Sequence, residues 1–166
     1  MRRNHKLLIF SLIFICFIAI YFFMDSLTLS NKIPYSNTKI YAHIEQIVLE
    51  NTIMESVELS DEIVIPLLQL IKEPIYYKFY EETYLGDTSL INLSIINNTD
   101  FPKVHYEFSI SDTGIIYIKD VYDKKVYSSY SLKPFYKFIY PVFTTSKNAE
   151  IELYNQMYDL IYMQED

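Results

Sequence analysis

The fold is decided by residues 103–122, which read KVHYEFSISDTGIIYIKDVY. From residue 104 to residue 110, apolar side chains alternate with polar ones, which is the period of a strand with one buried and one solvated face. Ser-Asp-Thr-Gly at residues 111–114 is a turn sequence, and a second apolar strand follows it at residues 115–122. The stretch therefore predicts two antiparallel strands joined by a tight turn. The residues expected to face the core are Val104, Tyr106, Phe108 and Ile110.

Further strands are predicted on both sides of this hairpin. Residues 126–132 follow a turn at residues 123–125 and complete a meander. Two earlier strands are expected at residues 76–84 and 89–96. A sixth candidate, residues 136–142, contains Pro141 and suits a sheet edge, because proline donates no ladder hydrogen bond. The sequence predicts an antiparallel sheet of five or six strands.

Helical spacing flanks the predicted sheet. Apolar residues three and four apart predict an amphipathic helix that begins near residue 38, and Pro66 fits the first turn of a short helix that ends at Ile71. A C-terminal helix is expected from Asn148 to Ile161. Residues 38–166 therefore read as one α+β domain, with helices across one face of the sheet. The order of elements resembles that of cystatin-like and nuclear-transport-factor-like folds, a resemblance that implies layering only.

The N-terminus contains an apolar segment. Residues 7–24, LLIFSLIFICFIAIYFFM, carry no charge and follow Arg2, Arg3 and Lys6. As a helix they would be about 27 Å long, close to the thickness of a bilayer core. We predict a cytoplasmic basic stub at residues 1–6, a single transmembrane anchor at residues 7–24 and a juxtamembrane tether at residues 25–37, with the domain outside the cytoplasm. The alternative is a cleaved signal peptide, which the length of the segment and its bulky end disfavour.

The charge of the predicted exported part restricts its partners. Beyond residue 24 there are 11 basic and 21 acidic residues, because three of the 14 basic residues precede it, and the net charge there is −10. An acidic domain repels phosphate backbones and anionic lipid surfaces, so no nucleic-acid partner is expected. A basic protein partner would be favoured electrostatically. Since Cys16 is the only cysteine, no intramolecular disulfide is possible.

Sequence motifs for common chemistry are missing. The chain has two glycines, Gly86 and Gly114, so the glycine clusters of dinucleotide and P-loop sites cannot be built. There is no G-x-S-x-G or H-E-x-x-H spacing, and we predict no cofactor, no metal and no enzyme. His105 and Glu107 share a strand face and are an acid–base candidate. Their polar neighbours favour a merely solvated face.

The expected function is therefore that of a membrane-anchored, extracytoplasmic protein-interaction domain. We predict a non-enzymatic subunit or accessory factor of a bacterial envelope complex. One alternative is an acidic inhibitor or immunity protein against a cationic extracytoplasmic toxin or hydrolase, and another is a carrier of a small apolar ligand. The residues predicted to form the partner-binding surface are Glu82, Glu107, Asp120, Asp123, Tyr117 and Tyr127.

Overall fold

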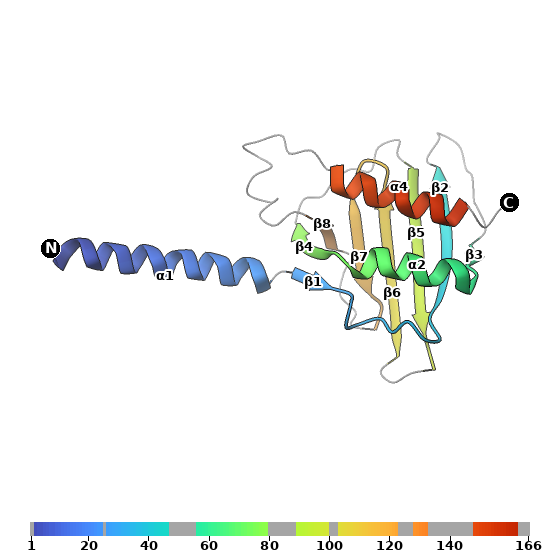
Figure 1. Cartoon of the computed structure of the whole chain (residues 1–166), viewed down its shortest axis with the longest axis horizontal. Coiled ribbons are helices and arrows are strands. Elements are labelled where there is room, and N and C mark those ends of the chain that lie inside the picture. The colour runs from blue at the N-terminus through green and yellow to red at the C-terminus, as the bar shows by residue number, and fades with distance from the viewer. Residues whose placement is uncertain are drawn as a thin grey trace.

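The computed structural model describes residues 2–24, 26–46, 56–79, 89–99, 103–122, 128–132 and 148–162. Within these ranges an N-terminal helix, α1 (Arg2–Met24), precedes an α+β domain (Figure 1). The other helices are α2 (Asp61–Lys72) and α4 (Asn148–Tyr162). The strands are β1 (Ser26–Thr28), β2 (Lys39–Gln46), β3 (Val57–Glu58), β4 (Ile75–Phe79), β5 (Ser89–Asn97), β6 (Val104–Ser111), β7 (Ile116–Asp120) and β8 (Ser128–Ser131).

In the described residues, the strands form one antiparallel sheet in the order β1-β4-β8-β7-β6-β5-β2-β3. The hairpin predicted from residues 103–122 is confirmed as β6 and β7, with Phe108 opposite Ile118. Its turn is closed by the Gly114 N–H, which donates to the Ser111 carbonyl at 2.9 Å, and Gly114 has a φ of 76°. A positive φ costs glycine least, because it has no Cβ.

The five firmly predicted strands correspond to β4, β5, β6, β7 and β8. The sixth candidate, residues 136–142, lies outside the described residues. The strands that the sequence did not predict are β1, β2 and β3, of which β1 and β3 have three and two residues. Strands β1 and β3 form the two edges of the sheet, and β2 lies between β5 and β3.

The helix predicted to begin near residue 38 is wrong, because β2 lies there. Its eight residues pair with β5, from Lys39 opposite Ile96 to Gln46 opposite Ser89. The segment also has the strand period, with Ile40 and Ala42 buried and Tyr41 between them less so. Pairing with the long β5 decides between the two periods, because it satisfies the backbone groups of both strands.

Helix α2 begins earlier than predicted. The Ser60 carbonyl accepts the N–H groups of Ile63 and Val64 at 3.0 and 2.9 Å, and Asp61 begins the helix. Pro66 therefore lies inside the helix and not in its first turn. The acidic Asp61 and Glu62 at its start interact favourably with the helix dipole.

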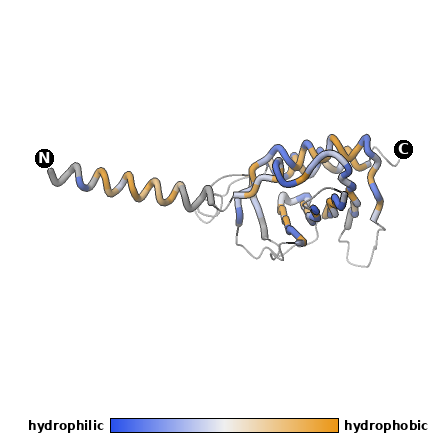
Figure 2. The backbone as a smooth tube through the Cα atoms, turned by 90° about the horizontal axis from the view of Figure 1, so that it is seen from below, coloured by the Kyte–Doolittle hydropathy of each residue, from blue (hydrophilic) through white to orange (hydrophobic). Residues whose placement is uncertain are grey.

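Helices α2 and α4 cover the same face of the sheet, as Figure 1 and Figure 2 show. Leu67 of α2 and Met157 of α4 are fully buried, as are Ile91 and Phe108 of the sheet. Tyr76 packs edge-on against Phe108, with ring centroids 5.9 Å apart. Its hydroxyl donates to the Ile71 carbonyl at 2.6 Å, and burial raises its pKa. The side chains between the sheet and the two helices form the core. They include the face of β6 that the sequence predicted to be buried.

The segment between α1 and β2 packs on the domain. Strand β1 pairs with β4, and Leu29 and Ile33 are buried. Lys72 of α2 donates to the Ile33 carbonyl, and its Nζ lies 3.4 Å from the centroid of the Tyr35 ring. The folded domain therefore includes much of the stretch that the sequence suggested as a tether.

Helix α1 extends away from the domain (Figure 1) and is apolar along most of its length (Figure 2). Several of its large side chains are exposed, with Phe10 the most exposed at 77%. In the part of the chain that the structure describes, no helix combines the length and the apolar character needed to cross a membrane.

Candidate functional site on the open face of the sheet

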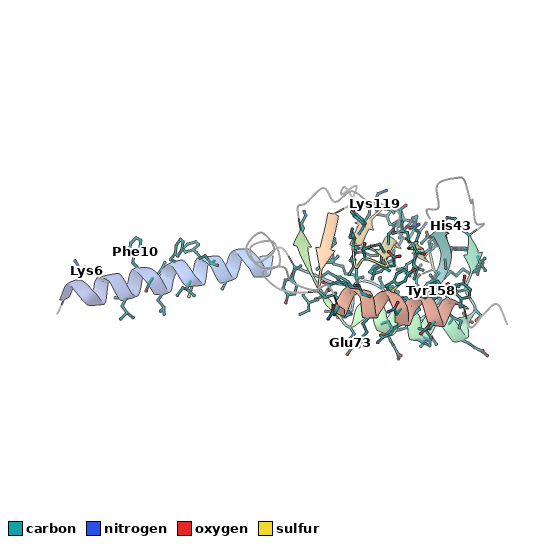
Figure 3. The ribbon with its side chains drawn as sticks, turned by 90° about the horizontal axis from the view of Figure 1, so that it is seen from above. Lys6, Phe10, His43, Glu73, Lys119 and Tyr158 are labelled. Carbon is teal, nitrogen blue, oxygen red and sulfur yellow. The ribbon has the colours of Figure 1, made fainter. Side chains whose placement is uncertain are left out.

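The sheet presents a polar face on the side opposite α2 and α4. Cross-strand pairs place its side chains in two rows over β2, β5, β6 and β7. In Figure 3, His43 and Lys119 point away from the helical layer that carries Glu73 and Tyr158. We call this side the open face. From β7 to β2, the first row consists of Tyr117, Ser109, Asn92 and His43. The second row consists of Lys119, Glu107, Ser94 and Tyr41.

The open face is hollowed over β2, β5 and β6. The hollow has a volume of about 350 Å³. That is at the low end of the range for small-molecule pockets. The described residues that line it are Tyr41, His43, Ser56, Asn92, Leu93, Ser94, Glu107 and Ser109.

Hydrogen bonds across the strands hold the polar groups of the hollow. The Ser109 hydroxyl donates to Asn92 Oδ1 at 2.6 Å. Ser94 Oγ lies 3.1 Å from His105 Nε2, a contact in which either group can be the donor. The His105 ring also meets the Tyr122 ring edge-on, with centroids 6.2 Å apart. These contacts reduce the number of rotamers that the lining side chains can adopt, so the hollow is partly preorganised.

Two ion pairs connect neighbouring strands on this face. Lys119 Nζ lies 3.1 Å from Glu107 Oε2, and the two side chains are 29% and 31% exposed. Lys39 Nζ lies 2.7 Å from Glu58 Oε1 at the β2–β3 edge, where both side chains are more exposed. The hydrogen bond between them raises the pKa of Lys39 and lowers the pKa of Glu58. Each of these pairs balances one positive and one negative charge, and Glu107 is the one charged residue among the described residues that line the hollow.

The structure brings together two of the six predicted partner-binding residues. Glu107 and Tyr117 both lie on the open face. Asp120 does not, because it is opposite Tyr106, whose side chain is buried on the helical side. Asp120 Oδ1 accepts the Tyr122 N–H at 3.1 Å, so it serves a turn. The remaining three, Glu82, Asp123 and Tyr127, lie outside the described residues.

His105 and Glu107, the acid–base candidate, lie on the same face of β6, as the sequence predicted, and each contacts a neighbouring strand. His105 contacts Ser94 on β5, and Glu107 contacts Lys119 on β7. Each side chain of the candidate pair is thus oriented by a neighbouring strand. Among the described residues, no three His, Cys, Asp or Glu side chains are grouped so that they could hold a metal ion.

Most of the residues lining the hollow were not identified from the sequence. Tyr41 and His43 were missed because β2 was predicted to be helical. Ser56 was missed because it directly precedes β3, which is too short to show a period. Asn92 and Ser94 are the polar positions of β5, and their alternation with buried residues was the available indication. No protein family, curated protein or solved structure matches the chain.

Proposed function

We propose that the protein is a membrane-anchored, extracytoplasmic interaction domain that binds a protein partner through the open face. In this role it is a non-enzymatic subunit or accessory factor of a bacterial envelope complex. The observation that carries the proposal is the difference between the two faces of the sheet. One face is closed by α2 and α4, and the other presents a hollow with polar and aromatic side chains.

The composition of the open face supports a protein partner. Tyr41 and Tyr117 are partly exposed there, and tyrosines are enriched at the centres of protein interfaces. The charges of Glu107 and Lys119 are already paired with each other. A partner would therefore meet a surface that offers hydrogen bonds and aromatic contacts without a large excess of charge.

The anchor is proposed from the whole sequence of residues 7–24 and from the exposure of α1. The segment carries no charge, and basic residues precede it. Its described large apolar side chains, such as Phe10, are exposed. Exposing them in water is costly, whereas a bilayer accommodates them. The excess of basic residues before the segment favours an N-terminus in the cytoplasm.

Site-specific photocrosslinking in intact cells tests the interaction. A photoreactive phenylalanine analogue at Tyr117 reports contacts of the open face, and the same analogue at Gln69 reports contacts of the exposed side of α2. We expect a discrete crosslinked protein from position 117 that is absent from position 69. Crosslinks of equal yield from both positions, or from position 69 alone, would contradict the proposal.

A further inference from the structure

We propose that the hollow in the open face is a pocket for an arginine side chain of the protein partner, with the Glu107 carboxylate as its counter-ion. This inference rests on the proposed function, because it names the group that the open face receives. Three properties of the hollow lead to it: the polarity of the lining, the sign of its charge and the arrangement of its hydrogen-bond acceptors.

The polar groups in the lining favour an occupant that can form hydrogen bonds. Seven of the eight described lining residues have polar side chains. An inserted leucine or phenylalanine would remove water from them without replacing the lost hydrogen bonds, which costs free energy for each group. An occupant that combines hydrogen-bond donors with an apolar stem or a flat face therefore suits the hollow.

The charge of the lining favours a cation. Among the described residues that line the hollow, Glu107 is the one with a formal charge at neutral pH. A phosphate or carboxylate group would be repelled by it, whereas a guanidinium would be attracted. Lys119 contacts Glu107 Oε2 and does not line the hollow. A guanidinium would therefore compete with Lys119 for the carboxylate, or share it.

The acceptors suit a guanidinium better than an ammonium. The hollow combines the Glu107 carboxylate, the Asn92 carbonyl oxygen and the Ser94 hydroxyl. Arginine has five N–H donors in a flat fork and can contact several acceptors at once, whereas lysine presents a compact point charge. The Tyr41 ring in the lining adds a surface on which a flat cation can stack.

The experiment measures ligand binding by the full-length protein in detergent micelles, using NMR chemical-shift titration. The probes are N-acetyl-arginine amide, its neutral analogue N-acetyl-citrulline amide, and maltose as an uncharged polyol. We expect the arginine derivative to bind more tightly than either neutral probe. The shifts should concentrate at Asn92, Ser94 and Ser109, which line the hollow.

Two substitutions with opposite expected effects distinguish a binding role of Glu107 from a purely structural role of its ion pair with Lys119. Glu107→Gln should weaken arginine binding by at least about tenfold, because a charge-assisted contact is lost. Lys119→Gln should strengthen it several-fold, because the carboxylate loses its internal partner. A purely structural ion pair would instead make both variants bind less. Glu73→Gln, which removes one exposed negative charge from the helical side of the domain, is the control and should leave binding unchanged.

Three results would overturn the proposal. They are equal binding of the arginine and citrulline derivatives, binding of maltose alone, and arginine binding unaffected by Glu107→Gln. None of them alters the crosslinking experiment at Tyr117. The partner surface and the arginine pocket can therefore fail separately.

Discussion

Phe108 shows how far a single residue could be assigned from the sequence alone. The alternation in residues 103–110 predicts that its ring faces the core, and the ring is fully buried against Tyr76. We expect Phe108→Ala to lower the free energy of unfolding by about 3 to 5 kcal/mol, because both apolar area and packing are lost. Urea denaturation followed by circular dichroism measures it. The exposed Lys103 beside the same strand is the control, and Lys103→Ala should change stability by less than about 0.5 kcal/mol.

Lys72 is a buried cation whose charge is destabilised by its surroundings. Desolvation lowers its pKa, although its Nζ donates to the Ile33 carbonyl and lies over the Tyr35 ring. The unfolded chain therefore binds this proton more tightly than the folded chain. The contribution of Lys72 to stability should rise as the pH increases from its lowered pKa toward the ordinary value of about 10.4.

The comparison with Lys72→Met isolates this effect, because methionine keeps a similar volume and has no charge. The difference in unfolding free energy, wild type minus variant, should increase with pH in the alkaline range. The measurement is urea denaturation of both proteins at several pH values. A constant difference would show that folding leaves the pKa of Lys72 unchanged, and a decrease would show that the fold stabilises the cation.

At the scale of elements, Asn97 joins the end of β5 to the segment that precedes β2. Its buried side chain makes four hydrogen bonds, to the Ser36 carbonyl, to Thr38 Oγ1 and to two groups of Thr99. We expect Asn97→Ala to cost about 1 to 3 kcal/mol, because it removes these hydrogen bonds and the buried Thr38 hydroxyl loses this partner.

The neighbouring asparagine provides a matched control. Asn98 is exposed, and Asn98→Ala should cost less than about 0.5 kcal/mol. Amide hydrogen exchange should also accelerate in residues 29–38 of the Asn97 variant, since that segment loses its attachment to β5. Equal losses of stability in the two variants would argue against the anchoring role.

The elements that were predicted correctly depend on local pattern. Strands β6 and β7 are joined by a short turn, so their alternation and the turn at Gly114 suffice to pair them. Strand β2 carries both a helical and a strand period, and only its pairing with the distant β5 decides between them. Strands β1 and β3 are too short to have a period at all. Their existence depends on neighbours that the sequence does not specify locally.

The residues of the candidate site also divide into those that local alternation predicts and those that depend on long-range strand pairing. Glu107 was assigned to the correct face because β6 alternates clearly. Asp120 has the same parity as the buried Ile116 and Ile118, so alternation along β7 was enough to exclude it from the open face. The hollow itself needs β2 beside β5 and β6. It is a product of long-range pairing, which no single segment contains.

At the scale of the molecule, the helical layer carries a group of exposed acidic side chains among the described residues. In the described parts of α2 and α4 the one basic residue is Lys72, which is buried. The exposed acidic residues there and at the adjoining cap are Asp61, Glu62, Glu73, Glu152 and Asp159.

This field should guide a basic partner toward the domain without contributing to the contact on the open face. Added salt should therefore lower the association rate and leave the dissociation rate nearly unchanged. Surface plasmon resonance with the crosslinked partner, once purified, measures both rates. Reversal of Glu73 and Asp159 to lysine should reproduce the effect of salt at low ionic strength. If neither added salt nor the charge reversal changed the association rate, the acidic residues would serve solubility alone.

The proposed anchor predicts a defined orientation of the whole chain. Only residue 25 lies between α1 and β1 in the sequence. The domain should therefore begin directly at the extracytoplasmic surface of the membrane that α1 is proposed to span. Protease added to intact spheroplasts should digest the domain and leave a fragment containing residues 1–24 in the membrane pellet. Replacing Arg2, Arg3 and Lys6 with glutamate should reduce the fraction of chains whose domain is digested, because basic residues beside a span dominate its orientation. A soluble mature protein that begins after residue 24 would instead establish cleavage, and the open face would then act without an anchor.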